Sequence, residues 1–225
     1  MTESKKEKSC LVTQNLISSI NWCMSAPNSV IKPEKGGDGQ MTWKQKAYDD
    51  LHNIVNRVKT PFPEPARQGV EFEKQVYKCA SSVTMKGSKN FQEVVNAVKG
   101  YEFYQKGGLT KLIGGHQCYL YAKYDAIRKG DKLIDIKTTA SYKPGKYLNG
   151  FQHKLYCYIA DIDWFKYVIA EWDKYPKIKD VYEEVFEVTD KEMLEKEIEY
   201  TIMDAFELLK DLNLWDAYRE TYCLY

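Results

Sequence analysis

The chain has 225 residues, enough for one folded domain with a substantial core, and 44% of them are hydrophobic. Its 33 lysine and arginine residues nearly balance its 32 aspartate and glutamate residues, which excludes the strong basic excess of a protein that binds nucleic acid through charge alone. A nucleic-acid partner must therefore be inferred from a specific site.

The N-terminus offers no targeting signal. Five of the first eight residues are charged, and polar residues interrupt the stretch from Leu11 to Trp22, so neither segment resembles the apolar part of a signal peptide. Charges also interrupt every later apolar run before it reaches the roughly 18 residues of a spanning helix. We therefore expect a cytoplasmic protein with no membrane partner.

The six cysteines are scattered along the chain, without the C-x-x-C spacing that is typical of a metal site. A cytoplasmic chain of this size rarely depends on disulfides, so we expect buried free thiols. An iron–sulfur cluster or a zinc site, with ligands from distant segments, is an alternative that the spacing does not support. The cysteines are Cys10, Cys23, Cys79, Cys118, Cys157 and Cys223.

N-terminal helices are expected at about 11–60. A first helical piece at about 13–22 is followed by a loop at 25–40 that is rich in proline and glycine. A capping box of Thr42 and Gln45 opens the next helix. Its apolar residues recur at helical spacing and predict one buried face, before a proline-rich segment ends the helix. They are Trp43, Ala47, Leu51, Ile54, Val55 and Val58.

After two more helices the period of the sequence changes. These helices are expected at about 66–80 and 90–99. From Tyr101 to Thr139 the sequence is rich in tyrosine and β-branched residues, which predicts strands joined by turns. The expected breaks between strands are Gly107-Gly108, Gly114-Gly115 and Gly130.

The C-terminal third alternates between helix and strand. A helix is expected at 151–160, strands at 165–172 and 181–188, and a long helix at about 189–212 that opens with a second capping box at Thr189. We therefore predict an α/β (α+β) fold with a central mixed sheet flanked by helices. The whole chain, 1–225, is expected to form a single domain around a core at about 66–172.

Residues Ile134 to Lys137 place charge on one face of a predicted strand. Alternate strand residues share a face, so Asp135 and Lys137 point one way and the two isoleucines point the other. Alone, this D-I-K pattern is typical of a solvated ion pair at a sheet edge.

The preceding strand, Tyr119–Ile127, brings a second carboxylate to the same face. Only an odd-length loop within 128–132 aligns the apolar faces of the two strands, and that register sets Asp125 opposite Asp135. A loop of even length would bury Asp125 against Ile134. The pattern therefore favours two carboxylates that converge.

Glu73 is the third acidic candidate. Helical spacing places Glu73 on the apolar face of its helix and Glu71 on the polar face. An ionised carboxylate that faces the core needs a cation, because burying it unpaired is very costly.

These three carboxylates predict a metal site. Glu73, Asp125 and Asp135 would form an oxygen site suited to Mg²⁺ or Mn²⁺, and the Ile136 carbonyl could add a ligand. Such a site activates water for hydrolysis of a phosphodiester, while Lys137 stabilises the nucleophile or the transition state.

The helix at 151–160 supplies candidate substrate contacts. Gln152 and Tyr156 lie four residues apart and share one face, and Lys154 lies between them. Packing is the alternative role for Tyr156, because a tyrosine at helical spacing often serves the core. Further candidates for contacts with backbone phosphates are Lys143, Lys146 and His153.

The order of these motifs resembles that of the PD-(D/E)XK nucleases, and most of all the RecB-like and phage-type exonucleases. The resemblance covers roughly residues 66–172 and rests on four motifs. They are G-x-x-x-E at Gly69–Glu73, the lone Asp125, D-I-K at Asp135–Lys137, and Q-x-x-x-Y at Gln152–Tyr156.

The resemblance implies a restriction-endonuclease-like core and Mg²⁺-dependent DNA cleavage. It implies the same metal ligands, Glu73, Asp125 and Asp135, with Lys137 as the catalytic lysine and Gln152 and Tyr156 beside the active site. Some relatives carry a histidine in the first motif and an iron–sulfur cluster. Neither the histidine nor a recognisable cysteine cluster is present here, so the cluster is not carried over.

The resulting hypothesis is a metal-dependent DNA exonuclease of phage or mobile-element recombination, or of DNA processing. Candidate partners are DNA, a single-strand annealing protein and further copies of the chain. Two alternatives stay open, namely a non-catalytic nucleic-acid-binding module on the same fold and a structure- or sequence-specific endonuclease.

Overall fold

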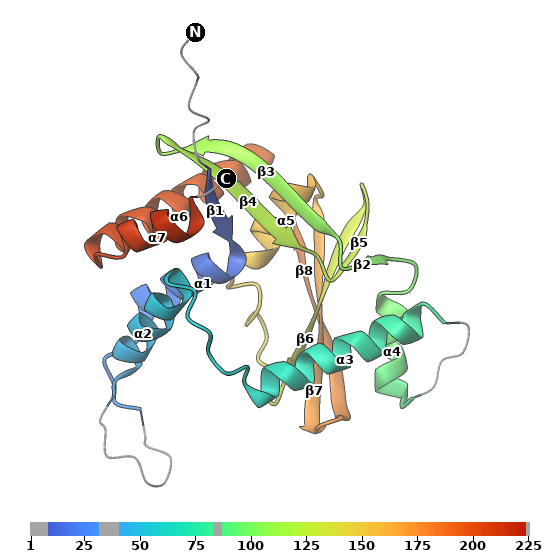
Figure 1. Cartoon of the computed structure of the whole chain (residues 1–225). Helices are drawn as coiled ribbons and strands as arrows, with labels where there is room; N and C mark the ends of the chain where they lie inside the picture. The colour runs from blue at the N-terminus through green and yellow to red at the C-terminus, as the bar shows by residue number, and fades with distance from the viewer. Residues whose placement is uncertain (1–8, 32–40, 83–86, 224–225) are drawn as a thin grey trace. The chain divides into compact units, whose positions relative to one another are not determined.

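A computed structural model of the chain describes residues 9–31, 41–82 and 87–223 (Figure 1). The charged residues 1–8 and positions 32–40 of the expected loop lie outside this range. The chain forms two compact units, the first from residues 1–60, 109–121 and 196–225 and the second from residues 61–108 and 122–195. In the described part of the chain, every helix is too short or too polar to cross a membrane.

The first unit combines helices with a small sheet. The sheet has the order β1-β4-β3, and β1 runs parallel to β4. The hairpin turn between β3 and β4 is Gly114-Gly115, where both glycines have positive φ, as the sequence predicts for a break. The strands are β1 (Cys10–Thr13), β3 (Lys106–Ile113) and β4 (His116–Lys123), and the helices are α1 (Gln14–Ser25), α2 (Trp43–Val55), most of α6 (Lys191–Asp211) and α7 (Trp215–Tyr222).

The capping box at Thr42 is confirmed. The Gln45 backbone N–H donates to the Thr42 hydroxyl at 3.1 Å, and the Thr42 N–H donates to the Gln45 side chain at 2.9 Å. Of the predicted apolar stripe, Ala47, Leu51 and Val55 are buried. At the other capping box, the residue that accepts is Asp190 rather than Thr189, because the Met193 N–H bonds to the Asp190 carboxylate.

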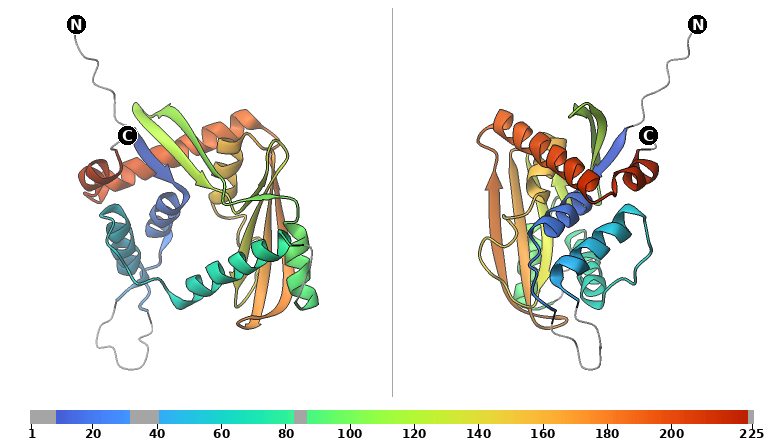
Figure 2. Two further views of the ribbon diagram at one scale, coloured as in Figure 1. Left: turned by 45° about the vertical axis from the view of Figure 1, so that its right-hand side comes forward. Right: turned by 90° about the vertical axis from the view of Figure 1, so that its left-hand side faces the viewer.

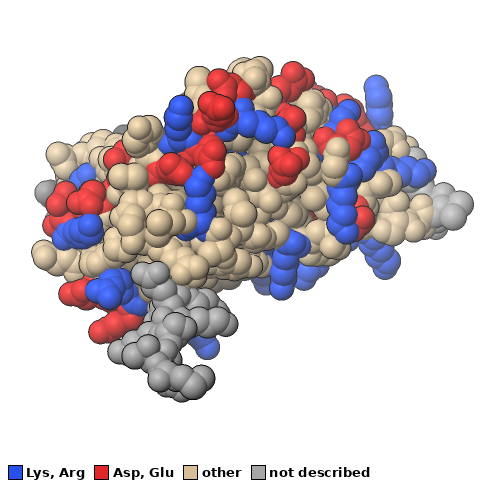
Figure 3. Space-filling model, turned by 90° about the horizontal axis from the view of Figure 1, so that it is seen from above, with Lys and Arg blue, Asp and Glu red and all other residues tan. Residues whose placement is uncertain are grey.

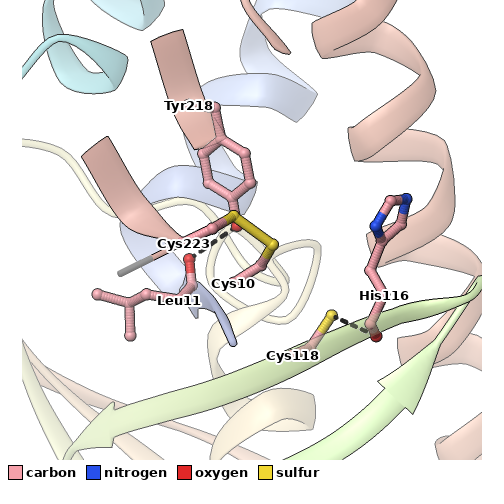
Figure 4. Close-up of a disulfide and its surroundings, with 6 residues drawn as sticks. All are labelled: Cys10, Leu11, His116, Cys118, Tyr218 and Cys223. Atoms are coloured by element: carbon pink, nitrogen blue, oxygen red, sulfur yellow. Dashed lines mark hydrogen bonds between the residues drawn. A yellow bond between two sulfur atoms is a disulfide. The ribbon is translucent and has the colours of Figure 1, made fainter. Parts of the chain in front are cut away.

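A disulfide joins Cys10 to Cys223, so the expectation that every cysteine is a free thiol was wrong (Figure 4). The sequence analysis missed both β1 and α7, and therefore also missed that they meet. The Tyr218 hydroxyl of α7 donates to the Leu11 carbonyl of β1 at 3.0 Å, next to the two sulfur atoms. Four cysteines are free thiols, and the expectation of a buried free thiol holds for Cys23, Cys118 and Cys157, whereas Cys79 is only partly buried.

The second unit is built on a mixed five-stranded sheet of order β2-β5-β6-β7-β8. The neighbours β6 and β7 run parallel, and the other pairs are antiparallel. A mixed sheet with flanking helices is the predicted architecture. The strands are β2 (Glu102–Phe103), β5 (Ala126–Arg128), β6 (Lys132–Thr139), β7 (Trp164–Lys174) and β8 (Lys177–Glu187).

The hairpin register is the one that the apolar pattern predicts. Arg128 pairs with Lys132 and Ala126 with Ile134, around a turn in which Gly130 has a φ of 71°. The pairing ends with Ala126 and Ile134, and the next residue, Asp125, lies at the edge of β6, where its carboxylate accepts a hydrogen bond from the Ile136 N–H. The odd-length loop is thereby confirmed.

The strand expected at Tyr119–Ile127 is broken, which corrects the sequence analysis. β4 ends at Lys123 in one sheet and β5 begins at Ala126 in the other. The break is held by backbone bonds, since the Tyr124 N–H donates to the Gln105 carbonyl at 2.8 Å. The expected break at Gly107-Gly108 lies instead within β3, where a side chain at Gly107 would collide with the Tyr124 hydroxyl.

Helices cover the two faces of this sheet. On one face α3 (Glu64–Ala80) and α4 (Lys89–Ala97) pack against β6, β7 and β8 (Figure 2). Their common core includes Ile134 and Ile136, as alternation along β6 requires. On the other face α5 (Gln152–Ala160) contacts β7. Asp135 and Lys137 point to this second face, away from the two isoleucines.

Candidate active site

The site forms along β6 where its neighbour β5 has ended. The pairing of β6 with β5 stops at Ile134, so the next residues of β6 have no partner strand on that side. The Asp125 carboxylate fills the gap, because its Oδ2 accepts a hydrogen bond from the Ile136 N–H at 3.3 Å. Because the chain breaks before β5, Asp125 bonds to the edge of β6 through its side chain rather than through its backbone.

Asp135, Lys137 and Gln152 form a closed set of polar contacts. The Gln152 amide donates to Asp135 Oδ1 at 2.5 Å, and the Lys137 ammonium donates to Gln152 Oε1 at 2.8 Å. Lys137 Nζ also lies 2.6 Å from Asp135 Oδ2. Asp135 is only 2% exposed, and the structure brings the D-I-K motif into contact with Gln152 of the last motif.

Glu73 approaches this group from α3, and Gly69 makes the approach possible. A Cβ at Gly69 would lie 3.1 Å from the Thr138 hydroxyl of β6, tighter than ordinary contact. Glu73 follows one turn later and is partly buried, whereas Glu71 is exposed. The helical face therefore selects the glutamate that the sequence predicted.

The carboxylates repel one another. Burial and the charge of Asp135 raise the pKa of Glu73 to about 7. Burial, together with the charges of Asp135 and Glu73, raises the pKa of Asp125 well above its ordinary range. Burial would lower the pKa of Lys137, but the surrounding carboxylates outweigh it and the pKa is raised. Ionised together, the three carboxylates would carry more negative charge than the one lysine neutralises, and this repulsion is why the pKa values of Glu73 and Asp125 are raised.

A divalent cation suits this donor set. Among the described residues, no three side chains of aspartate, glutamate, histidine or cysteine are arranged as a ready metal site. However, the contact of Lys137 with the buried Oδ2 of Asp135 lacks hydrogen-bond geometry, so this oxygen has a charge partner and no directed donor. Hard carboxylate oxygens under mutual repulsion are the chemistry that Mg²⁺ and Mn²⁺ satisfy.

A buried glutamate that the sequence analysis missed anchors the loop between β6 and α5. Glu184 of β8 is 6% exposed and accepts hydrogen bonds from the Tyr142 hydroxyl and from the Tyr147 and Leu148 backbone N–H groups, at 3.0–3.2 Å. The loop leads directly into Gln152. Glu184 carried no sequence signal, because charged residues occupy both faces of its strand.

The remaining substrate candidates lie in different surroundings. Tyr156 is buried with its ring edge-on to Tyr124, a packing position beside the site. Lys154 is partly buried and lies two residues from Gln152, a spacing that does not share a helix face. Their contacts with substrate stay predictions, as do those of the exposed Lys143 and Lys146.

His153 does not meet the expectation of a phosphate contact. It is 1% exposed, its Nδ1 lies 3.3 Å from the Tyr167 hydroxyl, and it packs against Phe165 and Phe186. Burial lowers the pKa of His153 to about 4, so the ring is neutral at pH 7. It is a core histidine.

Two tyrosines beside the acidic group were also missed. Tyr77 lies one turn after Glu73, and its buried hydroxyl has no hydrogen-bond partner among the described residues. Burial and the charges of Asp125 and Glu73 raise the pKa of Tyr77. Tyr104 packs edge-on against Tyr77, with ring centroids 5.0 Å apart. Helical spacing from Glu73 could have found Tyr77, whereas Tyr104 lies in a turn.

The described residues on the face drawn in Figure 3 form no continuous basic surface that would attract a polyanion. On the face drawn in Figure 3, basic and acidic side chains are interspersed. This agrees with the net charge of +1. Recognition of a polyanion would therefore depend on local groups at the site.

No protein-family model and no curated protein sequence matches the chain. Solved structures do match it. The alkaline exonuclease LHK-Exo from Laribacter hongkongensis has a TM-score of 0.51 at 13% identity, over 90% of this chain and 89% of that chain. LHK-Exo in complex with dAMP has a TM-score of 0.50 at 16% identity, over 90% and 89%.

A phage-related exonuclease from Haemophilus somnus 129PT also matches, with a TM-score of 0.47 at 13% identity, over 91% of this chain and 92% of that chain. The two LHK-Exo structures show that the chain has the fold of this exonuclease, in agreement with the restriction-endonuclease-like core that the motifs predicted. At these identities the likeness concerns the fold.

Proposed function

We propose that the chain is a metal-dependent DNA exonuclease that hydrolyses phosphodiester bonds. The observation that carries the proposal is the set formed by Asp135, Lys137 and Gln152, with Asp125 and Glu73 beside it. A purely structural ion pair would not need two further carboxylates that raise its electrostatic cost. The fold of LHK-Exo supports the proposal independently of the side chains.

Glu73, Asp125 and Asp135 would hold the cation, with the Ile136 carbonyl as a further ligand. When bound, Mg²⁺ or Mn²⁺ lowers the pKa of a coordinated water and offsets charge on the phosphate. Lys137 is held by Asp135 and Gln152, which keeps its ammonium at a fixed point and ready to donate to a phosphate oxygen. Gln152 orients both residues, because it contacts each of them.

The wider setting is part of the same proposal. Phage or mobile-element recombination, or DNA processing, follows from the resemblance of the motifs. A single-strand annealing protein and further copies of the chain are the partners to test. Tyr156 and Lys154 would contact DNA close to Gln152.

The direct test incubates the protein with linear DNA and either Mg²⁺ or Mn²⁺. We expect stepwise release of nucleotides from DNA ends and loss of this activity in Asp135→Asn. The matched control is Asp173→Asn, since Asp173 is an exposed aspartate paired with Lys177 at the far end of the neighbouring strand. Absence of degradation with any metal, or equal degradation by Asp135→Asn, would contradict the proposal.

The same assay separates the alternatives. Tight DNA binding without turnover would indicate a non-catalytic module on the nuclease fold. Cleavage of closed circular DNA would indicate an endonuclease, because a circle offers no end to an exonuclease.

A further inference from the structure

An exposed aromatic ring lies beside the acidic site. Tyr104 follows β2 and is 44% exposed. Its backbone N–H donates to the carbonyl of Asp125 at 3.3 Å, so its position is tied to that of a proposed metal ligand. Burial and the charges of Glu73 and Asp125 raise the pKa of Tyr104, in keeping with this position.

The backbone of Tyr104 adopts a conformation that disfavours a tyrosine. Its φ is 56°, in the left-handed region where glycine or asparagine is more easily accommodated. An exposed ring recovers little of this cost through burial. Non-glycine residues held in this way are concentrated at functional sites.

Another aromatic ring packs against Tyr104, and a lysine lies over its ring. Tyr104 packs edge-on against Tyr77, and Tyr77 stacks on Phe103 with ring centroids 4.5 Å apart. The ammonium of Lys123, itself exposed, lies 5.6 Å from the centre of the Tyr104 ring. A firmly supported aromatic surface next to a cation is the combination that binds single-stranded nucleic acid, through base stacking and phosphate contact.

Building on the proposed function, we propose that Tyr104 is the surface on which a nucleobase next to the scissile phosphate stacks, while Lys123 contacts the backbone phosphate. Ionised carboxylates at the site would repel a polyanion, whereas stacking on a neutral ring does not depend on charge. Tyr104 would therefore hold a strand end at the site even when no metal is bound. Because every base has a π-face, the contact would tolerate any sequence.

The test measures binding rather than turnover. Single-stranded oligonucleotides with 2-aminopurine at the end or in the middle are titrated into the Asp135→Asn variant in EDTA, where degradation does not interfere. We expect fluorescence quenching for 2-aminopurine near the end of the strand. Adding Tyr104→Leu should remove the quenching and weaken binding about tenfold. Adding Tyr104→Trp should preserve both.

Two further variants separate the roles of ring and cation. Lys123→Gln should keep the quenching and lower the slope of log affinity against log salt by about 0.7, the value for one phosphate contact on a single strand. Tyr200→Leu removes a tyrosine that is 64% exposed in α6, and it should change neither quantity.

Tyr104→Gly separates the stacking role from a merely structural role. The glycine removes the backbone strain along with the ring, so the stacking proposal predicts an unchanged or higher melting temperature together with weaker binding. A lower melting temperature with unchanged affinity would overturn the inference.

The failure of the inference differs from that of the proposed function. If Tyr104→Leu in the otherwise wild-type chain degrades DNA with unchanged KM and the binding variants keep full affinity, only the stacking surface is wrong. If the wild-type chain neither binds nor degrades DNA, the proposed function is wrong as well.

Discussion

The two units of the chain differ in what they bury. Among the described residues, the buried aspartate, glutamate and histidine side chains all belong to the second unit, and they are Asp135, His153, Glu171 and Glu184. The first unit buries apolar and aromatic side chains, such as Phe206 and Tyr218, which pack against the partly buried Trp215, together with the Cys10–Cys223 disulfide. Both units have a hydrophobic core, but among the described residues only the second unit also buries carboxylates and a histidine, whose burial costs stability.

Within the second unit the buried charges are of two kinds. Glu171 and Glu184 accept hydrogen bonds from tyrosine hydroxyls, lysine or backbone N–H groups. Asp135 instead lies among like charges. Glu171 and Glu184 therefore hold the scaffold together, whereas Asp135 lies in an unfavourable electrostatic environment that a bound cation would relieve. Substitutions at the site should therefore act mainly on activity, whereas substitutions in the first unit should act mainly on stability.

The largest effect is expected for Lys137→Met. The methionine fills a similar volume but leaves Asp135 and the proposed phosphate position without an ammonium, so kcat should fall by about 10²- to 10³-fold. Steady-state rates on linear DNA measure it. Lys166→Met is the control, because Lys166 pairs with Glu183 on the same sheet without contacting the site. A variant that keeps nearly full kcat would show that the buried charge of β6 is structural.

A smaller effect is expected from the titration of Glu73. Its pKa is raised from an ordinary 4.5 to about 7, so its protonated form stabilises the metal-free fold, and this contribution is lost as the pH rises through about 7. Between about pH 5.5 and pH 8 the free energy of unfolding should fall by about 2 kcal/mol, at about 1.4 kcal/mol per pKa unit. Denaturant unfolding in EDTA measures this difference.

Two controls test whether Glu73 is responsible. Glu73→Gln should flatten the dependence of stability on pH, and Glu71→Gln should leave it unchanged, because Glu71 is exposed on the same helix. Mg²⁺ favours the ionised carboxylate, so its addition should restore stability at pH 8 and reduce the difference. An equal slope in wild type and Glu73→Gln would mean that Glu73 does not share the charge of the site.

The correct predictions came from patterns that repeat every two to four residues. Alternation along β6 separated Asp135 from Ile136, and the same two-residue period predicted the hairpin register that brings Asp125 to the edge of β6 beside Asp135. The 3.6-residue period of α3 separated Glu73 from Glu71. Each of these relations lies within one element or one hairpin, where the local pattern determines the geometry. The fold class followed from the order of such elements.

What the sequence could not predict depends on contacts between distant segments. β1 has four residues and exists because it pairs with β4, more than a hundred positions away, and its disulfide spans 213 residues. The break between Lys123 and Ala126 arises from backbone bonds to the turn at Tyr104. Glu184 acquires its role only when the loop after β6 folds onto β8. No periodicity records such contacts.

The smallest effect is expected in the first unit, for Tyr218→Phe. The variant removes the hydroxyl that donates to the Leu11 carbonyl at 3.0 Å and keeps the aromatic packing, so the free energy of unfolding should fall by about 1 kcal/mol. The exposed Tyr200→Phe should have no effect. Because the hydrogen bond does not require the disulfide, the loss should be similar with Cys10–Cys223 oxidised or reduced, and kcat below the melting temperature should not change. A fall in kcat without a loss of stability would show that the first unit contributes to the chemistry, and the division between a stabilising and a functional unit would then be wrong.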